Sequence, residues 1–347
     1  MPKFVGGAVG IDSRVSISKV LFVKVITYEL NMKFAVIGTG GVGGYFGGML
    51  ARSGADVWFV ARGAHLDAMK SRGLQINSTD GNFVIPPGTM TDNLSAIGVV
   101  DVVLFCVKSY DTESSAQRLA PLLSDRTIII SLQNGVDNEE KIQRSILRGT
   151  VYGGLAYIYS TISEPGVVSE TGGPKRIIFG PLTKVGEAGN TRGAQILETM
   201  LKAGIKATYS EDIHSEIWKK FIFIAAVGGL TALTRLTLGE ILAVDETRSF
   251  LRDAMREAEA IAIAKGAKIE AGYIDMIFET LKKFDNNSRS SLHYDLSHEK
   301  PMEIEAFSGT IMRYGKELGI STPIHRSIYA ALLPYHLKHL KPRQGAR

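Results

Sequence analysis

The sequence predicts an α/β domain built on a parallel sheet, followed by an all-helical domain. Two observations carry this prediction. From Met32 to about Ser210, apolar β-branched runs alternate with helical stretches, as in crossover units that build a parallel sheet. Beyond that point apolar residues recur at helical spacing instead. Because 347 residues suffice for two domains with separate cores, we place the domains at residues 32–210 and 211–347.

The elements of the first domain follow in order along the chain. Apolar runs predict strands at Phe34–Gly38, Asp56–Ala61, Asp101–Val107 and Thr127–Leu132. Helices are expected between them at Gly41–Ser53, Ala64–Arg72 and Thr112–Leu123. The later stretches 151–170 and 175–182 predict shorter strands with a Pro-Gly turn between them, forming an antiparallel extension of the sheet.

The second domain begins with a strongly apolar helical segment. In "EDIHSEIWKKFIFIAAVGGLTALT" the residues Ile213, Ile217, Phe221 and Ile224 recur at helical spacing. No low-complexity linker precedes this segment, so we expect the two domains to pack closely over a shared cleft. Residues 1–31 fit neither domain, and we expect them to be a dispensable extension.

Composition excludes several classes of protein. The chain is 45% hydrophobic, its net charge of +5 is modest, and no basic cluster is interleaved with aromatic residues as nucleic-acid binding would require. No uninterrupted apolar run reaches the roughly 18 residues of a membrane span. The single cysteine, Cys106, lies in an apolar run and permits neither an internal disulfide nor a multi-cysteine zinc site. We therefore expect a cytoplasmic protein without metal.

A glycine cluster follows the first predicted strand and opens the first predicted helix. Gly38, Gly40 and Gly43 form G-x-G-x-x-G in the context that gives this pattern meaning. The three glycines allow a tight turn, close approach of a pyrophosphate, and packing of helix on strand, while free N–H groups face the phosphates. The sequence thus predicts a Rossmann-type dinucleotide site, with contacts from Gly38, Thr39, Gly40, Gly41, Val42 and Gly43.

The second predicted strand indicates which dinucleotide binds. An NAD site places a carboxylate at the tip of this strand for the ribose 2′-hydroxyl, but here the tip is "FVARG". Arg62 can pair with a 2′-phosphate, whereas Asp56 lies at the wrong end of the strand. The sequence therefore favours NADP(H), the alternative being that Arg62 only faces solvent.

Several stretches resemble the ketopantoate reductase family, the NADPH-dependent enzymes of pantothenate biosynthesis. They are "VIGTGGVGG", "FCVKSYDT", "LQNGV", "IWKKF" and "SSLHYDLSHEKPMEIEAFSG", and their order and spacing carry the resemblance across nearly everything from Met32 onward. The resemblance implies reduction of 2-dehydropantoate (ketopantoate) to (R)-pantoate on the way to coenzyme A. Its substrate would be a small 2-oxo acid.

The resemblance also implies roles for five residues. Lys220 corresponds to the proton donor of the family and contacts the substrate. Lys108 corresponds to a lysine that contacts the cofactor, and Asn134 to a residue near the nicotinamide and the substrate. Ser291 corresponds to a substrate-binding serine, and Glu303 would hold the ammonium in place or bind the cofactor ribose.

The chemistry of Lys220 agrees with that implied role. Hydride transfer to a 2-oxo acid builds negative charge on the carbonyl oxygen, which an ammonium can stabilise and then protonate. Partial burial on an apolar helix lowers the pKa of a lysine toward neutrality. Helical spacing alone does not separate Lys219 from Lys220, and a surface lysine beside Trp218 is the alternative.

The sequence departs from the family pattern after this lysine. Two asparagines that bind substrate in the family are replaced by Ile224 and Gly228, so we expect a more apolar pocket. This leaves open a reductase of another 2-oxo acid, of the D-2-hydroxyacid dehydrogenase type, or a non-catalytic NADP-binding sensor. A homodimer also stays open, with "AALLPY" near the end of the chain as a candidate contact.

Overall fold

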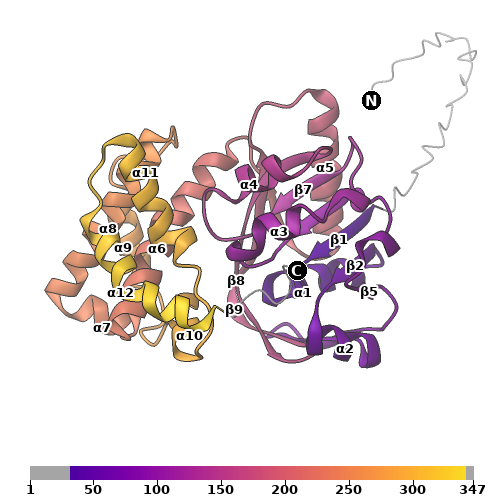
Figure 1. Ribbon diagram of the computed structural model, residues 1–347, viewed down its shortest axis with the longest axis horizontal. Coiled ribbons are helices and arrows are strands. Elements are labelled where there is room, and N and C mark those ends of the chain that lie inside the picture. The colour runs from indigo at the N-terminus through magenta and orange to yellow at the C-terminus, as the bar shows by residue number, and fades with distance from the viewer. Residues whose placement is uncertain (1–31, 341–347) are drawn as a thin grey trace, which may run out of the picture. The chain divides into compact units, whose positions relative to one another are not determined.

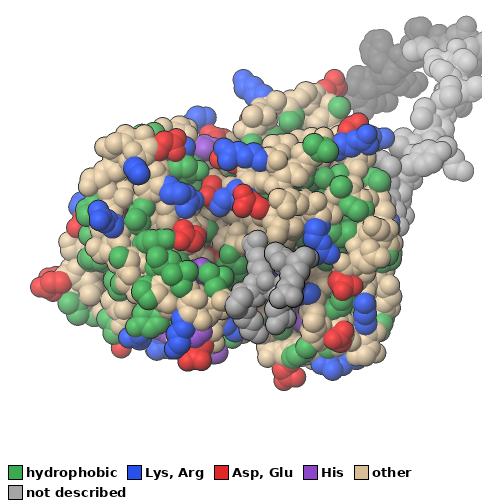
Figure 2. Space-filling view, viewed as in Figure 1, with side chains coloured by type: hydrophobic (Ala, Val, Ile, Leu, Met, Phe, Trp, Pro, Cys, Tyr) green, Lys and Arg blue, Asp and Glu red, His purple; other side chains and the backbone are tan. Residues whose placement is uncertain are grey.

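The computed structural model describes residues 32–340, so the predicted extension at residues 1–31 lies outside the described residues. The predicted α/β fold is confirmed. A mixed ten-stranded sheet is followed by a helical domain. In Figure 1 the strands lie in the indigo to rose part of the ribbon, and α6 to α12 form the orange to yellow part. Figure 2 shows acidic and basic side chains interspersed over the face in view.

The sheet has the order β4-β3-β9-β8-β7-β6-β1-β2-β5, with β10 paired to β9. Its strands are β1 Lys33–Ile37, β2 Asp56–Val60, β3 Leu74–Asn77, β4 Phe83–Ile85, β5 Met90–Thr91, β6 Val102–Phe105, β7 Ile128–Ser131, β8 Thr150–Glu164, β9 Val167–Pro181 and β10 Lys206–Tyr209. In the parallel register Ile37 lies opposite both Val60 and Phe105. The carboxyl ends of β1, β2 and β6 therefore meet at one edge, where ligands of such sheets bind.

The β8–β9 hairpin corrects the prediction of shorter strands. Each strand has 15 residues, and they pair antiparallel from Tyr152 opposite Pro181 to Glu164 opposite Val167. The gap between the two predicted stretches, residues 171–174, lies inside β9. There the pairing with β8 is only irregular in register, near Tyr157. Gly172 and Gly173 have φ of 139° and 88°, which lets the strand bend there without ending.

The helices of the first domain cover the sheet. They are α1 Gly41–Arg52, α2 Gly63–Arg72, α3 Thr112–Ala116, α4 Asn138–Ser145 and α5 Glu187–Lys202, with short 3₁₀ segments η1 Leu94–Ala96, η2 Ser109–Asp111 and η3 Ala120–Leu122. The predicted helix Thr112–Leu123 is wrong in its second half, because α3 ends at Ala116 and a 3₁₀ turn follows. Pro121 lies in that turn and lacks the N–H that an α-helix would need.

The second domain packs around one central helix, α6. Its elements are α6 Ile213–Thr234, α7 Leu238–Ala243, α8 Asp245–Ala264, α9 Tyr273–Leu281, α10 Ser291–Ser297, the π-helical η4 Glu305–Gly309, α11 Thr310–Leu318 and α12 Pro323–His339. With 22 residues and a mean hydropathy of 1.4, α6 has the length and composition of a membrane span, which no uninterrupted apolar run had suggested. However, 67% of that window is buried, and its residues build the domain core.

The predicted domain boundary near residue 210 falls between β10 and α6. The Asp212 carboxylate accepts a hydrogen bond from the Ser215 N–H at 3.2 Å and so caps α6. The residues from Met32 onward nevertheless cluster as one compact unit, and α6 contacts both β8 and β9. The start of α6 is therefore held against the long hairpin of the sheet.

Candidate active site

The glycine loop leaves open space at the end of β1. Gly38 has φ of 93°, and a Cβ at this position would lie 2.8 Å from the Val107 nitrogen. A Cβ at Gly43 would lie 2.3 Å from the Gly38 oxygen, so this glycine lets α1 pack against the turn. A Cβ at Gly40, by contrast, would meet nothing within 4 Å. Tight packing at two glycines and open space at the third fit a dinucleotide pyrophosphate.

The remaining residues of the loop tie it to its neighbours. The Thr39 N–H and hydroxyl both donate to the Val60 carbonyl, at 3.0 Å each, so this side chain faces the end of β2. A Cβ at Gly41 would lie 2.2 Å from the Ser160 oxygen, because the β8–β9 hairpin crosses the first turn of α1. Val42 is half-buried and packs against the core under the sheet.

Arg62 lies directly after β2, and its side chain is 83% exposed. Its guanidinium contacts the Asp111 carboxylate at 2.7 Å. Asp111 ends η2, which follows β6 on the far side of β1. The arginine is thus solvent-facing, as in the alternative interpretation, but it is also paired with an acid that the sequence analysis did not foresee.

Lys108 joins the two domains through two buried carboxylates. Its ammonium lies 3.0 Å from Asp295 and 3.0 Å from Glu303, and the second oxygen of Glu303 accepts the Ser109 N–H at 2.9 Å. Burial opposes both charges, but the ion pair outweighs it, raising the pKa of Lys108 and lowering that of Glu303. Burial raises the pKa of Asp295, which the Lys108 charge offsets only in part.

Lys220 projects from α6 onto the loop that follows β7. Its ammonium donates to the Asn134 side-chain oxygen at 2.8 Å and to the Ala156 carbonyl at 2.7 Å. Burial lowers its pKa to about 8, and the nearby Glu303 charge opposes that shift. Lys219 instead forms an ion pair with Glu270 at 2.6 Å. The geometry therefore separates the two lysines, and only Lys220 reaches the Asn134 loop.

Neighbouring side chains hold the Asn134 loop in place. Gln133 donates to the Val107 carbonyl at 2.9 Å and to the Thr112 hydroxyl at 2.8 Å. The Asn138 amide donates to the Asn134 carbonyl at 2.9 Å. These supporting residues have no role among the sequence-based predictions. The sequence feature that could have indicated them is the polar run after β7, in which Gln133 is part of the "LQNGV" stretch.

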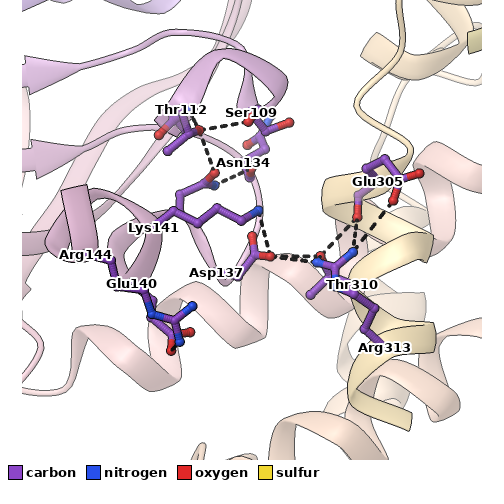
Figure 3. A network of polar contacts seen from close by, with 12 residues as sticks. Ser109, Thr112, Asn134, Asp137, Glu140, Lys141, Arg144, Glu305, Thr310 and Arg313 are labelled. Carbon is purple, nitrogen blue, oxygen red and sulfur yellow. Dashed lines mark hydrogen bonds and ion pairs between the residues drawn. The ribbon is translucent and has the colours of Figure 1, made fainter. Parts of the chain in front are cut away.

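An ion cluster fixes the same loop to the helical domain. One oxygen of the Asp137 carboxylate contacts Lys141 at 2.8 Å and Arg313 at 2.8 Å, and it accepts a hydrogen bond from Thr310 at 3.3 Å. Figure 3 shows Arg313 and Thr310 projecting from α11 toward Asp137. Asp137 is only 6% exposed, so the carboxylate end of this link between the loop and α11 is buried.

The structure does not bring Ser291 into this cluster. Ser291 is exposed at the start of α10, where a serine-rich loop was expected. Among the described residues, it is Ser290 that connects this turn to α6. Its hydroxyl caps α10 by accepting the His293 N–H at 3.0 Å and lies 2.7 Å from the Thr231 hydroxyl. Any substrate contact of Ser291 therefore stays a prediction.

The two departures from the family pattern lie on α6 beyond Lys220. Ile224 is half-buried and packs against the core of the helical domain. A Cβ at Gly228 would already lie 3.4 Å from Phe307 and 3.9 Å from Leu292. Apolar side chains thus surround the place where an asparagine side chain would extend.

A Rossmann-type domain whose glycine loop fits a dinucleotide, joined to a helical domain that supplies a half-buried lysine, defines a class: the dinucleotide-binding reductases. Comparison with known proteins narrows this class. The family model described as ketopantoate reductase PanE/ApbA matches residues 34–184, and the one for the C-terminal part of that family matches residues 212–336. The chain belongs to the ketopantoate reductase family.

Individual relatives agree with this assignment. The chain is 30% identical over 306 residues to the uncharacterized oxidoreductase YkpB of Bacillus subtilis, covering 88% of this chain and 99% of that protein. It is 30% identical over 299 residues to 2-dehydropantoate 2-reductase of Pyrococcus horikoshii, covering 86% and 96%. The crystal structure of a PanE/ApbA family ketopantoate reductase from Ralstonia eutropha superposes with a TM-score of 0.79 at 32% identity, covering 89% and 100%.

Proposed function

We propose that this chain reduces a 2-oxo acid with NADPH and that the substrate is 2-dehydropantoate, which would become (R)-pantoate. The observation that carries the proposal is the hydrogen bond of 2.8 Å between the Lys220 ammonium and Asn134. It brings the ammonium that we propose as the proton donor from the helical domain to the loop after β7, at the edge of the sheet where the glycine loop opens. Relatives named 2-dehydropantoate 2-reductase support the choice of substrate.

In this proposal the glycine loop and Arg62 hold the dinucleotide, which supplies the hydride when bound. The Lys220 ammonium stabilises the charge that develops on the substrate carbonyl oxygen and gives its Nζ proton to that oxygen. A pKa of about 8 leaves this group mostly protonated at neutral pH, yet more acidic than an ordinary lysine. Asn134 and the Ala156 carbonyl keep the ammonium directed at the loop.

A second candidate is the reduction of another 2-oxo acid, one with an apolar side chain. The packing of Phe307 and Leu292 around Gly228 favours this candidate, because neither Ile224 nor Gly228 has a side chain that can hydrogen-bond to a substrate hydroxyl. A site without such groups discriminates weakly between a hydroxylated substrate and an apolar one. Rates with both kinds of 2-oxo acid would separate the two candidates.

The test is a pair of variants on adjacent residues of α6. Following NADPH oxidation with 2-dehydropantoate, we expect Lys220→Ala to lower kcat by about 10²- to 10⁴-fold, the usual contribution of a general acid. Lys219→Ala removes the same charge one residue away and should retain most of the activity, since Lys219 pairs with Glu270. If the unaltered chain reduced no 2-oxo acid with either NADPH or NADH, the proposal would be wrong.

A further inference from the structure

The ion pair between Arg62 and Asp111 lies across the predicted dinucleotide site. Arg62 follows β2, Asp111 belongs to the segment that follows β6, and β1 with its glycine loop lies between these two strands. The two residues are separated by 49 positions in the sequence, yet their charged groups lie 2.7 Å apart. A carboxylate therefore stands beside the tip of β2, although the sequence of that strand ends without one.

Asp111 is the anchored member of the pair. Its N–H donates to the Lys108 carbonyl at 2.8 Å, and its carbonyl accepts the Ser114 hydroxyl at 3.2 Å. Its side chain is 23% exposed, against 83% for Arg62. A ligand arriving at the tip of β2 can thus displace the arginine more easily than the carboxylate.

Lys108 does not relieve the negative charge of Asp111. Its ammonium lies between Glu303 and Asp295, and the two negative charges of these carboxylates already exceed its single positive charge. Arg62 is therefore the cation that Asp111 contacts, and a 2′-phosphate must compete with this carboxylate for the same guanidinium. An unphosphorylated ribose meets no such competition, because a carboxylate accepts a hydrogen bond from its 2′-hydroxyl.

We infer that Asp111 sets the coenzyme preference of this site, weakening the binding of NADPH and supporting that of NADH, so that the chain accepts both dinucleotides. The inference rests on the proposed function, since it concerns the same site. Asp111 does not exclude NADPH, because an exposed ion pair such as this one changes an equilibrium by only about fivefold. The NADPH preference expected from Arg62 alone is reduced accordingly.

The experiment measures equilibrium binding of NADPH and of NADH separately, by calorimetric titration without substrate. In Asp111→Asn we expect NADPH to bind about fivefold tighter and NADH to bind more weakly, so that the ratio of the two dissociation constants moves about tenfold toward NADPH. Arg62→Gln should move the ratio the other way. Asp111→Ser, which removes the carboxylate with a smaller side chain, should repeat the shift of Asp111→Asn.

Asp125→Asn is the matched control. Asp125 is an exposed acid of the same domain that pairs only loosely with Arg148, at 3.9 Å. It precedes β7, and so lies at the opposite edge of the sheet from Asp111. This variant changes the net charge equally and should leave the ratio within about twofold.

The outcomes separate this inference from the proposed function. If the Asp111 variants bind both dinucleotides with the ratio of the unaltered chain, the inference is overturned and the proposed function stands. If the unaltered chain binds neither dinucleotide, the proposed function fails. A shift toward NADPH in both Asp111 variants, absent in Asp125→Asn, would establish Asp111 as the determinant.

Discussion

At the scale of single residues, the protonation of Lys220 determines how the proposed reaction depends on pH. Burial lowers the pKa of this lysine from 10.5 to about 8, so the ammonium form is lost as the pH rises through 8. We expect kcat for reduction of the 2-oxo acid to fall across that range. A kcat profile that stays flat until the ordinary lysine value of 10.5 would contradict a donor role for Lys220.

Single residues also show what the sequence could supply about the site. The motif "IWKKF" led to Lys220, but helical spacing left Lys219 as an equal choice until the ion pair with Glu270 distinguished them. Arg62 could be placed at the end of a strand because strands are local patterns. Its partner Asp111 could not, since their contact depends on the order of strands in the sheet.

At the scale of elements, different glycines of the turn between β1 and α1 serve the stability of the fold and the binding of the dinucleotide. A Cβ at Gly43 would lie 2.3 Å from the Gly38 oxygen, so we expect Gly43→Ala to lower the free energy of unfolding by about 1–3 kcal/mol. Gly40 has open space around its Cβ position, so Gly40→Ala should preserve stability and weaken dinucleotide binding. Urea unfolding and calorimetric titration of both variants test this pair. Equal losses of stability in both would refute it.

The elements that the sequence predicted well are those with long apolar runs. The four predicted strands correspond to β1, β2, β6 and β7, which are buried in the middle of the sheet. Strands β4 and β5 went unpredicted because they have only three and two residues, and β3 and β10 because polar residues interrupt their four-residue runs, LQIN and KATY. The length of the β8–β9 hairpin was missed because glycines inside a strand look the same in sequence as glycines that end one.

At the scale of the whole molecule, Glu303 joins the domains through Lys108 and the Ser109 N–H. We expect Glu303→Gln to lower the free energy of unfolding at neutral pH by about 2 kcal/mol, since it removes a buried carboxylate charge that pairs with the partly exposed Lys108. The matched control is Glu279→Gln, because Glu279 forms an exposed pair with Lys282.

The same pair predicts how stability depends on acid. The folded-state pKa of Glu303 is lowered, so its contribution is present above the ordinary value of 4.5 and is lost as the pH falls through the folded value. The difference in urea midpoint between the unaltered chain and Glu303→Gln should therefore shrink in acid. A difference independent of pH would show that the carboxylate charge is not the cause.

The placement of Lys219 and Lys220 on α6 has a consequence for how this chemistry can change. Adjacent residues of an α-helix point about 100° apart, so one lysine faces Glu270 and the other the loop after β7. Adding one residue between the Asp212 cap and this pair would turn the helix by the same angle and bring the first lysine into the surroundings of the second, and removing one would bring the second into those of the first. Such an insertion would leave the number of lysines unchanged and would alter only the direction in which each lysine points around the helix axis.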